Sequence, residues 1–189
     1  MLGQALRDRR VQLGVWFVVL PALLFGILGV LAPLRLAELG WSSVAIGATW
    51  LVAGLLETGN NVLIGRVTDR RGALAPIRAA LIASPVVALL LPWPDRAFVL
   101  ALLVVCAVLA FGSFYAPGMT LLSQAAEDRG LDYGYAFALV NLAWAPGQAA
   151  GSALGGTVAE KTSDAAPYLL LSALSVLTLL WLWRSGSSS

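Results

Sequence analysis

The sequence predicts an all-α membrane protein with six transmembrane helices. Of its 189 residues, 59% are hydrophobic and only 12% are charged, whereas a soluble domain carries about 25% charged residues. The charges fall between apolar runs, and a helix of roughly 20 apolar residues crosses a bilayer. The runs are continuous, as in Val15–Ala32 and Ala97–Phe111, and a helix satisfies all of its backbone hydrogen bonds within such a run.

Six spans are expected, and together they form one compact unit that covers residues 1–184. The spans are residues 12–34, 43–65, 74–92, 97–123, 134–158 and 166–183. Residues 185–189 are interpreted as a flexible tail or a cloning remnant outside this unit.

The basic residues predict the orientation of the spans. With the N-terminus in the cytoplasm, only Arg35, Arg96 and Lys161 of the 12 Lys and Arg residues lie on the outer side. Cytoplasmic loops carry such an excess of Lys and Arg, so we expect both termini in the cytoplasm. The abundance of alanine, leucine and arginine beside a single lysine indicates a bacterial protein, and hence the bacterial plasma (inner) membrane.

The composition also excludes several kinds of site. The chain has no His and one Cys, Cys106, so neither a zinc site nor a disulfide within the chain is expected. Without His or a clustered carboxylate pair, the usual groups for acid–base or nucleophilic catalysis are missing. We therefore expect no enzyme activity, no metal and no cofactor. The net charge of +2 is too small to indicate a nucleic-acid partner.

A glycine-bounded, arginine-rich segment joins the second span to the third. Its sequence is Gly65-Arg-Val-Thr-Asp69-Arg70-Arg71-Gly72. Glycine tolerates the backbone angles of a tight turn, so we expect a short cytoplasmic hairpin bounded by Gly65 and Gly72. Asp69 is placed to receive the positive N-terminal end of a neighbouring helix, although the arginines alone fit any cytoplasmic loop.

The spacing of this segment resembles the signature of the major facilitator superfamily, Gly-xxx-Asp-Arg-x-Gly followed by two basic residues. Gly65, Asp69, Arg70 and Gly72 match the signature, whereas the two positions after Gly72 are apolar here. The resemblance extends over nearly the whole chain. It implies that Asp69 and Arg70 belong to a cytoplasmic gate that latches one half of a transporter against the other.

The resemblance also implies an architecture. Members of the family have twelve helices in two six-helix halves, each a 3+3 inverted repeat, so this chain is similar to one half. Its fourth span, residues 97–123, contains no charge, whereas the first half of a member carries an arginine there; the chain therefore resembles the C-terminal half. A second six-helix half is the expected partner, and another copy of this chain is the leading candidate. The alternative is that the chain is a fragment.

Glu57 is the one acidic residue deep within a predicted span. A charge at the bilayer centre costs about 2.5–3.5 kcal/mol on insertion scales, so such a residue usually faces the bundle interior or a watery cavity. A low dielectric favours the neutral carboxyl, which suits a group that binds and releases a proton. Glu57 is therefore the predicted proton-coupling residue. The alternative is a protonated carboxyl that serves only as an interhelical hydrogen bond.

Three further polar or aromatic residues accompany Glu57 on the second span. Helical spacing places Trp50, Glu57 and Asn61 on one stripe, with Asn60 beside it. We predict that Trp50, Asn60 and Asn61 contact the substrate. The alternative for the two amides is that they tie the second span to the fifth.

The fifth span carries a matching stripe. Asn141, Trp144 and Gln148 recur at steps of three and four residues and are predicted to contact substrate. The same span has overlapping small-xxx-small units, which let helix backbones approach closely, so helix packing is predicted there. The glycines of these units are Gly147, Gly151 and Gly155. The run from 147 to 156 partly resembles the antiporter motif of the family, which favours efflux.

Tyr115 is the predicted substrate contact of the fourth span. The family resemblance implies that the first and fourth helices of a half line the central cavity, and we expect the pair Pro117-Gly118 to open the helix. The first span is almost free of polar groups between Gln12 and Arg35. A cavity wall of this kind favours an apolar or amphipathic substrate over a sugar or an amino acid.

These features favour a secondary transporter, or half of one, that exports a small apolar or amphipathic organic molecule in exchange for protons. Alternating access would come from rocking one six-helix unit against the other. The expected partners are membrane lipids, the small-molecule substrate, protons and the second half. The alternative is an isolated half or membrane scaffold that folds or dimerises without transport, since half a cavity is not a pathway.

Overall fold

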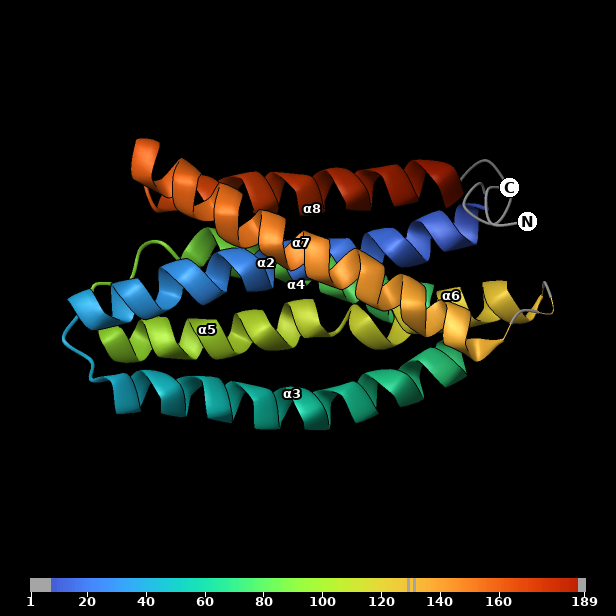
Figure 1. The fold of residues 1–189 in the computed structure, drawn as a ribbon, viewed down its shortest axis with the longest axis horizontal. Helices are drawn as coiled ribbons and strands as arrows, with labels where there is room; N and C mark the ends of the chain where they lie inside the picture. The colour runs from blue at the N-terminus through green and yellow to red at the C-terminus, as the bar shows by residue number, and fades with distance from the viewer. Residues whose placement is uncertain (1–7, 129, 131, 187–189) are drawn as a thin grey trace.

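The structure, a computed structural model, is a bundle of helices that run in alternating directions (Figure 1). It describes residues 8–128, 130 and 132–186. The helices are α2 (Arg9–Glu38), α3 (Ser43–Arg71), α4 (Leu74–Leu90), α5 (Ala97–Gly112), α6 (Tyr115–Glu127), α7 (Tyr133–Lys161) and α8 (Ala165–Gly186). Because α5 and α6 are consecutive parts of one span, the described chain crosses the bundle six times. The predicted all-α fold with six spans is confirmed.

The two ends of the bundle carry alternate connections. Figure 1 places the beginning of α2, the α3–α4 turn and the end of α8 together at one end, as the predicted topology requires. α8 continues to Gly186, so the first two residues assigned to a flexible tail are helical. Residues 187–189 lie outside the described residues, as do Arg7 and Arg129, which the predicted orientation counts as cytoplasmic.

The helices differ in how well they suit a lipid environment. In the described chain, α2, the combined α5–α6 segment and α8 are long and apolar enough to cross a membrane, and α4 is a shorter apolar helix. α3 and α7 have 29 residues each but fall outside this apolar set, because polar residues and glycines interrupt them. These two helices carry most of the candidate site residues.

α2 is the central helix of the bundle. The Asp8 side chain caps its start by accepting a hydrogen bond of 2.7 Å from the backbone N–H of Arg10. α2 contacts α5, α6, α7 and α8, and Leu20, Leu24 and Leu28 are fully buried. The apolar sequence of this helix is therefore explained by burial within the bundle. Its role as an apolar cavity wall stays a prediction.

A glycine on α2 lets this helix and α7 pack in close contact. At Gly26 an added Cβ atom would lie 2.6 Å from the backbone nitrogen of Ser152 and 2.9 Å from the carbonyl carbon of Gly151. The Ser152 hydroxyl donates a hydrogen bond of 3.2 Å to the Gly26 carbonyl. Backbone therefore meets backbone at this crossing, and no side chain fits between the helices.

The three glycines predicted for helix packing on α7 all lie against α2. An added Cβ atom at Gly147 would lie 3.0 Å from the Ala22 Cβ, and one at Gly155 would lie 2.8 Å from the Ile27 Cγ1. At Gly151 it would collide with a backbone carbonyl group of α2. The four-residue spacing matches the helical repeat, so the three glycines form one continuous contact strip.

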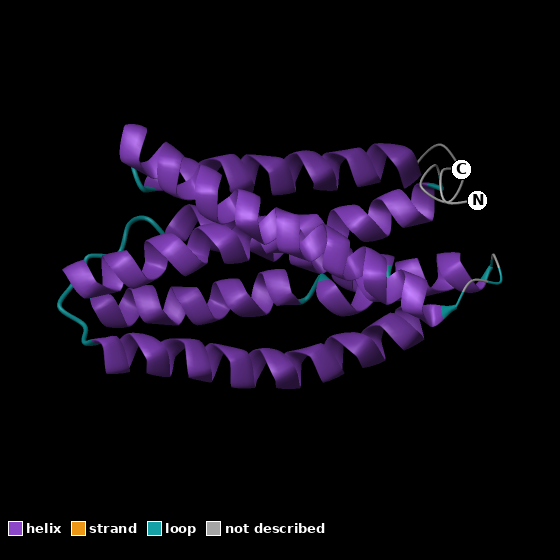
Figure 2. Cartoon of the chain, viewed as in Figure 1, coloured by secondary structure: helices purple, strands orange, loops and turns teal. Residues whose placement is uncertain are grey.

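The fourth span is broken between α5 and α6, where Figure 2 draws a short loop. The break is at Ser113 and Phe114, four residues before Pro117 rather than at the Pro117-Gly118 pair that the sequence indicated. Pro117 has no N–H to donate to the Ser113 carbonyl, and its ring clashes with the carbonyl four residues earlier. The helix therefore opens one turn before the proline.

The predicted hairpin between the second and third spans is shorter than expected. α3 continues as a helix to Arg71, so Gly65 lies within the helix and does not bound a turn. Gly72 alone makes the turn, with φ of 78°, a left-handed value that favours glycine. Its N–H donates to the Thr68 carbonyl at 2.8 Å. The segment between Gly65 and Gly72 holds no glycine or proline, so nothing in it ends the helix earlier.

The α2–α7 crossing generates the first prediction. Gly26→Ala should destabilise the bundle by about 1–3 kcal/mol, because the new methyl group meets backbone atoms that cannot turn away. Gly29→Ala is the matched control, since an added Cβ atom there meets nothing within 4 Å. Thermal unfolding of the detergent-solubilised protein measures both. Equal stability of the two variants would contradict the close crossing.

Candidate functional site

The side chain of Glu57 points from α3 into the bundle. An added Cβ atom at Gly112, the last residue of α5, would lie 2.5 Å from Glu57 Oε1 and 3.0 Å from its Cδ. The carboxyl group therefore packs on the backbone at the end of α5, directly before the break in the fourth span. Glu57 is half-buried. This face of α3 also holds the buried Thr49 and Ala53.

Asn60 bonds to the same part of the fourth span. Its Nδ2 atom donates to the Ser113 hydroxyl oxygen at 2.9 Å and to the Leu109 carbonyl at 3.3 Å. The Leu109 carbonyl also accepts from the Ser113 hydroxyl at 2.7 Å and from the Ser113 backbone N–H at 3.2 Å. Asn60 thus ties span two to span four. The alternative in which Asn60 bonds to the fifth span is wrong, because its Nδ2 atom donates to Ser113 and Leu109 of the fourth span.

Asn61 differs from its neighbour. It is half-buried, and its Oδ1 atom is shielded but has no hydrogen-bond partner within the described chain. A shielded carbonyl oxygen without a donor is destabilising, so this atom favours a ligand or partner group that donates a hydrogen bond. Trp50 lies nearer the start of α3 than Glu57 and Asn61 do, and it packs against the main hydrophobic core.

An aromatic cluster joins α2, α6 and α7. The rings of Phe25 and Trp144 have centroids 5.4 Å apart, and Tyr115 meets Trp144 edge to face at 6.2 Å. The indole Nε1 of Trp144 donates to Gln148 Oε1 at 3.2 Å. We call the three aromatic residues and Gln148, which is bonded to Trp144, the aromatic cluster. Three of them were predicted as substrate contacts, namely Tyr115, Trp144 and Gln148.

Asn141, the remaining predicted contact on α7, is exposed and lies outside this cluster. Its Nδ2 atom donates to the Phe137 carbonyl of its own helix at 2.9 Å. Its amide group is therefore partly occupied by a local bond, and no other residue of the predicted site bonds to it in the described chain.

Glu57 and the aromatic cluster approach the break in the fourth span from different helices. Gly112, which Glu57 contacts, is three residues from Tyr115. α3 packs on α5 and α6, whereas α7 packs on α2 and α6. The break therefore connects the carboxyl group on one side with the aromatic rings on the other.

The residues of the gating signature are at the surface. Asp69 and Arg70 are exposed at the end of α3, and neither side chain makes a hydrogen bond or ion pair within the described residues. A helix N-terminus that receives Asp69 is thus not found within the described chain. Arg35 on the opposite end of the bundle pairs with Glu38 at 3.0 Å, as a surface pair at i and i+3.

Three clefts between helices of the described chain lie elsewhere. One of about 350 Å³ lies between α2 and α8, one of about 160 Å³ between α2, α7 and α8, and one of about 370 Å³ between α3 and α5. Their walls contain none of the residues predicted to couple protons or contact substrate. Among the candidate site residues, Tyr115, Asn141 and Gln148 are exposed on an open face, whereas Glu57, Asn60 and Asn61 are half-buried.

Three residues of this region were not singled out from the sequence. Phe25 belongs to an apolar run and gives no signal of its own, Gly112 ends an apolar helix, and Leu109 takes part only through its carbonyl. Ser113, two residues before Tyr115, had a weak signal as a polar residue in an apolar span. Phe25, Gly112 and Leu109 are identified only by their tertiary contacts.

Six helical spans with a carboxyl group packed inside the bundle define a helical multi-span membrane protein. A sequence profile described as Major Facilitator Superfamily matches residues 1–145, from the start of the chain into α7. The match covers more than half of the chain, which therefore belongs to the Major Facilitator Superfamily, a family of membrane transporters and not of enzymes. The chain has about half the length usual in the family. A search of curated proteins found no match.

The bonds of Asn60 generate the second prediction. Asn60→Ala should lower the free energy of unfolding by about 1 kcal/mol, because interhelical hydrogen bonds in membrane proteins contribute about that much. Asn141→Ala is the matched control, since that amide bonds only to its own helix. Chemical or thermal unfolding in detergent compares them. An Asn60→Ala variant as stable as Asn141→Ala would contradict the tie between α3 and the fourth span.

Proposed function

We propose that this chain is a secondary active transporter, or one half of one, that exports a small apolar or amphipathic organic molecule in exchange for protons. The observation that carries the proposal is the Glu57 carboxyl group packed on Gly112 beside the broken fourth span. A half-buried carboxyl group next to a helix break can link its protonation to a change in how the helices pack. Membership of a transporter family supports the same interpretation.

The break in the fourth span is the proposed moving part. Ser113 and Phe114 interrupt the helix, and Asn60 holds the open turn from α3. Glu57 lies one helical turn from Asn60 on the same face of α3. In the proposed cycle, loss or gain of the Glu57 proton changes its packing on Gly112, and α6 moves relative to α5.

The aromatic cluster supports the proposed class of substrate. Phe25, Tyr115 and Trp144 present ring faces and edges on a partly exposed surface, and Gln148 offers a polar group beside them. Sites for small organic molecules typically combine mostly apolar walls with few polar groups. Trp50 and Asn141 remain proposed contacts of secondary importance, because neither lies in the cluster.

A second six-helix half would complete the site. The exposed candidate residues Tyr115, Asn141 and Gln148 lie on an open face, and α3 lies along one edge of the bundle (Figure 1). We propose that a second copy of the chain covers the open face, with Asp69 and Arg70 latching the two copies together. Resemblance to the C-terminal half of the family supports this arrangement, and rocking of the two copies would alternate access.

A proton-coupling role for Glu57 predicts the behaviour of reconstituted protein. With an acid-inside pH gradient, proteoliposomes should accumulate ethidium, an amphipathic fluorescent probe, and Glu57→Gln should reduce accumulation to that of protein-free liposomes. The amide keeps the size of the side chain but cannot release a proton. Glu160→Gln on the exposed end of α7 is the control and should transport normally. Undiminished accumulation by Glu57→Gln would remove the coupling role.

The position of the carboxyl group is testable separately. Gly112→Ala places a methyl group 2.5 Å from the original position of Glu57 Oε1, and the flexible side chain must move aside. We expect a folded protein with strongly reduced pH-driven ethidium accumulation. Gly118→Ala on the same span is the matched control, because its added Cβ atom would make ordinary contacts of 3.5 Å or more. Equal transport by both variants would show that the packing of Glu57 on Gly112 is unimportant.

A membrane scaffold without transport is the second candidate function, and the open face of a single bundle favours it. Native mass spectrometry of the detergent-solubilised protein, together with the ethidium assay, separates the candidates. The transporter proposal predicts a dimer of identical chains that accumulates ethidium, whereas a dimer without ethidium transport would favour a scaffold. A strict monomer without ethidium transport would favour a scaffold or a fragment.

A further inference from the structure

A groove between α2 and α8 lies at the end of the bundle where α2 begins and α8 ends. Figure 1 shows the start of α2 and the end of α8 side by side at this end. The groove has a volume of about 350 Å³ and is lined mainly by Arg9, Leu13 and Trp16 of α2 and Leu177, Thr178 and Trp181 of α8. We call it the α2–α8 groove. It contains none of the residues proposed for transport.

The two walls of the groove are held together by a tryptophan. The indole Nε1 of Trp16 donates to Thr178 Oγ1 at 3.1 Å, and the Thr178 hydroxyl donates to the Leu174 carbonyl of its own helix at 2.8 Å. Trp181, on the same helix, is 48% exposed. Tryptophan rings of this kind are typical of the membrane–water interface, so the groove lies at the level of lipid headgroups.

Arg9 supplies a positive charge to this groove. Its guanidinium carbon lies 5.7 Å from the centroid of the Trp181 ring, and Arg9 makes no hydrogen bond or ion pair within the described residues. The groove therefore offers a charged group with unused hydrogen-bond donors beside an apolar wall.

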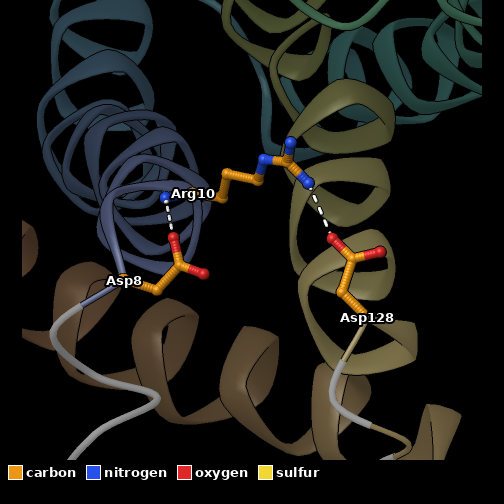
Figure 3. Close-up of polar contacts among 3 residues, drawn as sticks. All are labelled: Asp8, Arg10 and Asp128. Atoms are coloured by element: carbon orange, nitrogen blue, oxygen red, sulfur yellow. Dashed lines mark hydrogen bonds and ion pairs between the residues drawn. The ribbon is translucent and has the colours of Figure 1, made fainter.

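The neighbouring arginine is engaged elsewhere. Arg10 Nη1 forms an ion pair of 2.7 Å with Asp128 Oδ2 at the end of α6, and Figure 3 shows its side chain reaching across to that helix. Both partners are more than half exposed, so the pair contributes little to stability. Arg9 and Arg10 therefore differ in their contacts. Arg9 lines the groove, whereas Arg10 pairs with Asp128.

We propose that the α2–α8 groove binds an anionic phospholipid. Arg9 would bind the lipid phosphate, Trp16 and Trp181 would flank the headgroup region, and Leu13 and Leu177 would contact the start of the acyl chains. The groove is open at its side, and α2 and α8 are both apolar enough to span a membrane, so a lipid can enter from the bilayer without leaving it. This inference rests on membrane embedding and is independent of transport.

Native mass spectrometry with added lipid tests the proposal. The wild-type protein, in neutral detergent, should retain dioleoyl phosphatidylglycerol and lose dioleoyl phosphatidylcholine under the same activation. Arg9→Gln should reduce retention of phosphatidylglycerol roughly fivefold, the effect of about one basic residue at an anionic lipid surface. Arg10→Gln removes the same charge one residue away and should leave retention within about twofold.

Two further arms test the apolar contacts of the lipid and distinguish it from a free phosphate. Trp181→Ala should weaken retention of phosphatidylglycerol, while Trp93→Ala, an exposed tryptophan at the opposite end of the bundle, should not. Inorganic phosphate at millimolar concentration should not displace the lipid, because it lacks the apolar contacts. Equal losses in Arg9→Gln and Arg10→Gln, equal retention of both lipids, or displacement by inorganic phosphate would each overturn the proposal.

Discussion

Backbone hydrogen bonding within an apolar bundle shapes this structure more than any other requirement. Inside lipid each backbone polar group must find a partner within the protein, and six helical spans meet that requirement almost everywhere. One exception is the break in the fourth span, where Pro117 leaves the Ser113 carbonyl without its helical donor. Asn60 and the Ser113 hydroxyl both bond to the Leu109 carbonyl one turn earlier, so polar groups gather at a point that apolar residues surround.

The glycine contacts of α2 explain where the other candidate residues lie. Gly26, Gly147, Gly151 and Gly155 let α7 approach α2 until the backbones touch. This approach brings Trp144 to Phe25 and Tyr115, while α3 reaches the same broken span from another direction. A bundle with bulkier residues at the crossing would hold α7 further away, and the rings would not meet.

The proposed transport site and the α2–α8 groove use different parts of the same central helix. Phe25 lies near the middle of α2, and Arg9 lies at its first residue. By the helical rise of 1.5 Å per residue, they are about 24 Å apart along the axis. A lipid at Arg9 would therefore touch the helix that supports the aromatic cluster without blocking the cluster itself.

The fold class, the six spans and the family could be predicted from the order of residues, because continuous apolar runs and the spacing of Gly65, Asp69, Arg70 and Gly72 are visible in it. Glu57 also stood out in the sequence, as an acidic residue deep within a predicted span. Helix packing determines which atoms each side chain meets: Asn60 bonds to the fourth span rather than the fifth, and the helix opens at Ser113 rather than at Pro117. A helical pattern gives the face of a residue, whereas its partner depends on how neighbouring helices pack and cross.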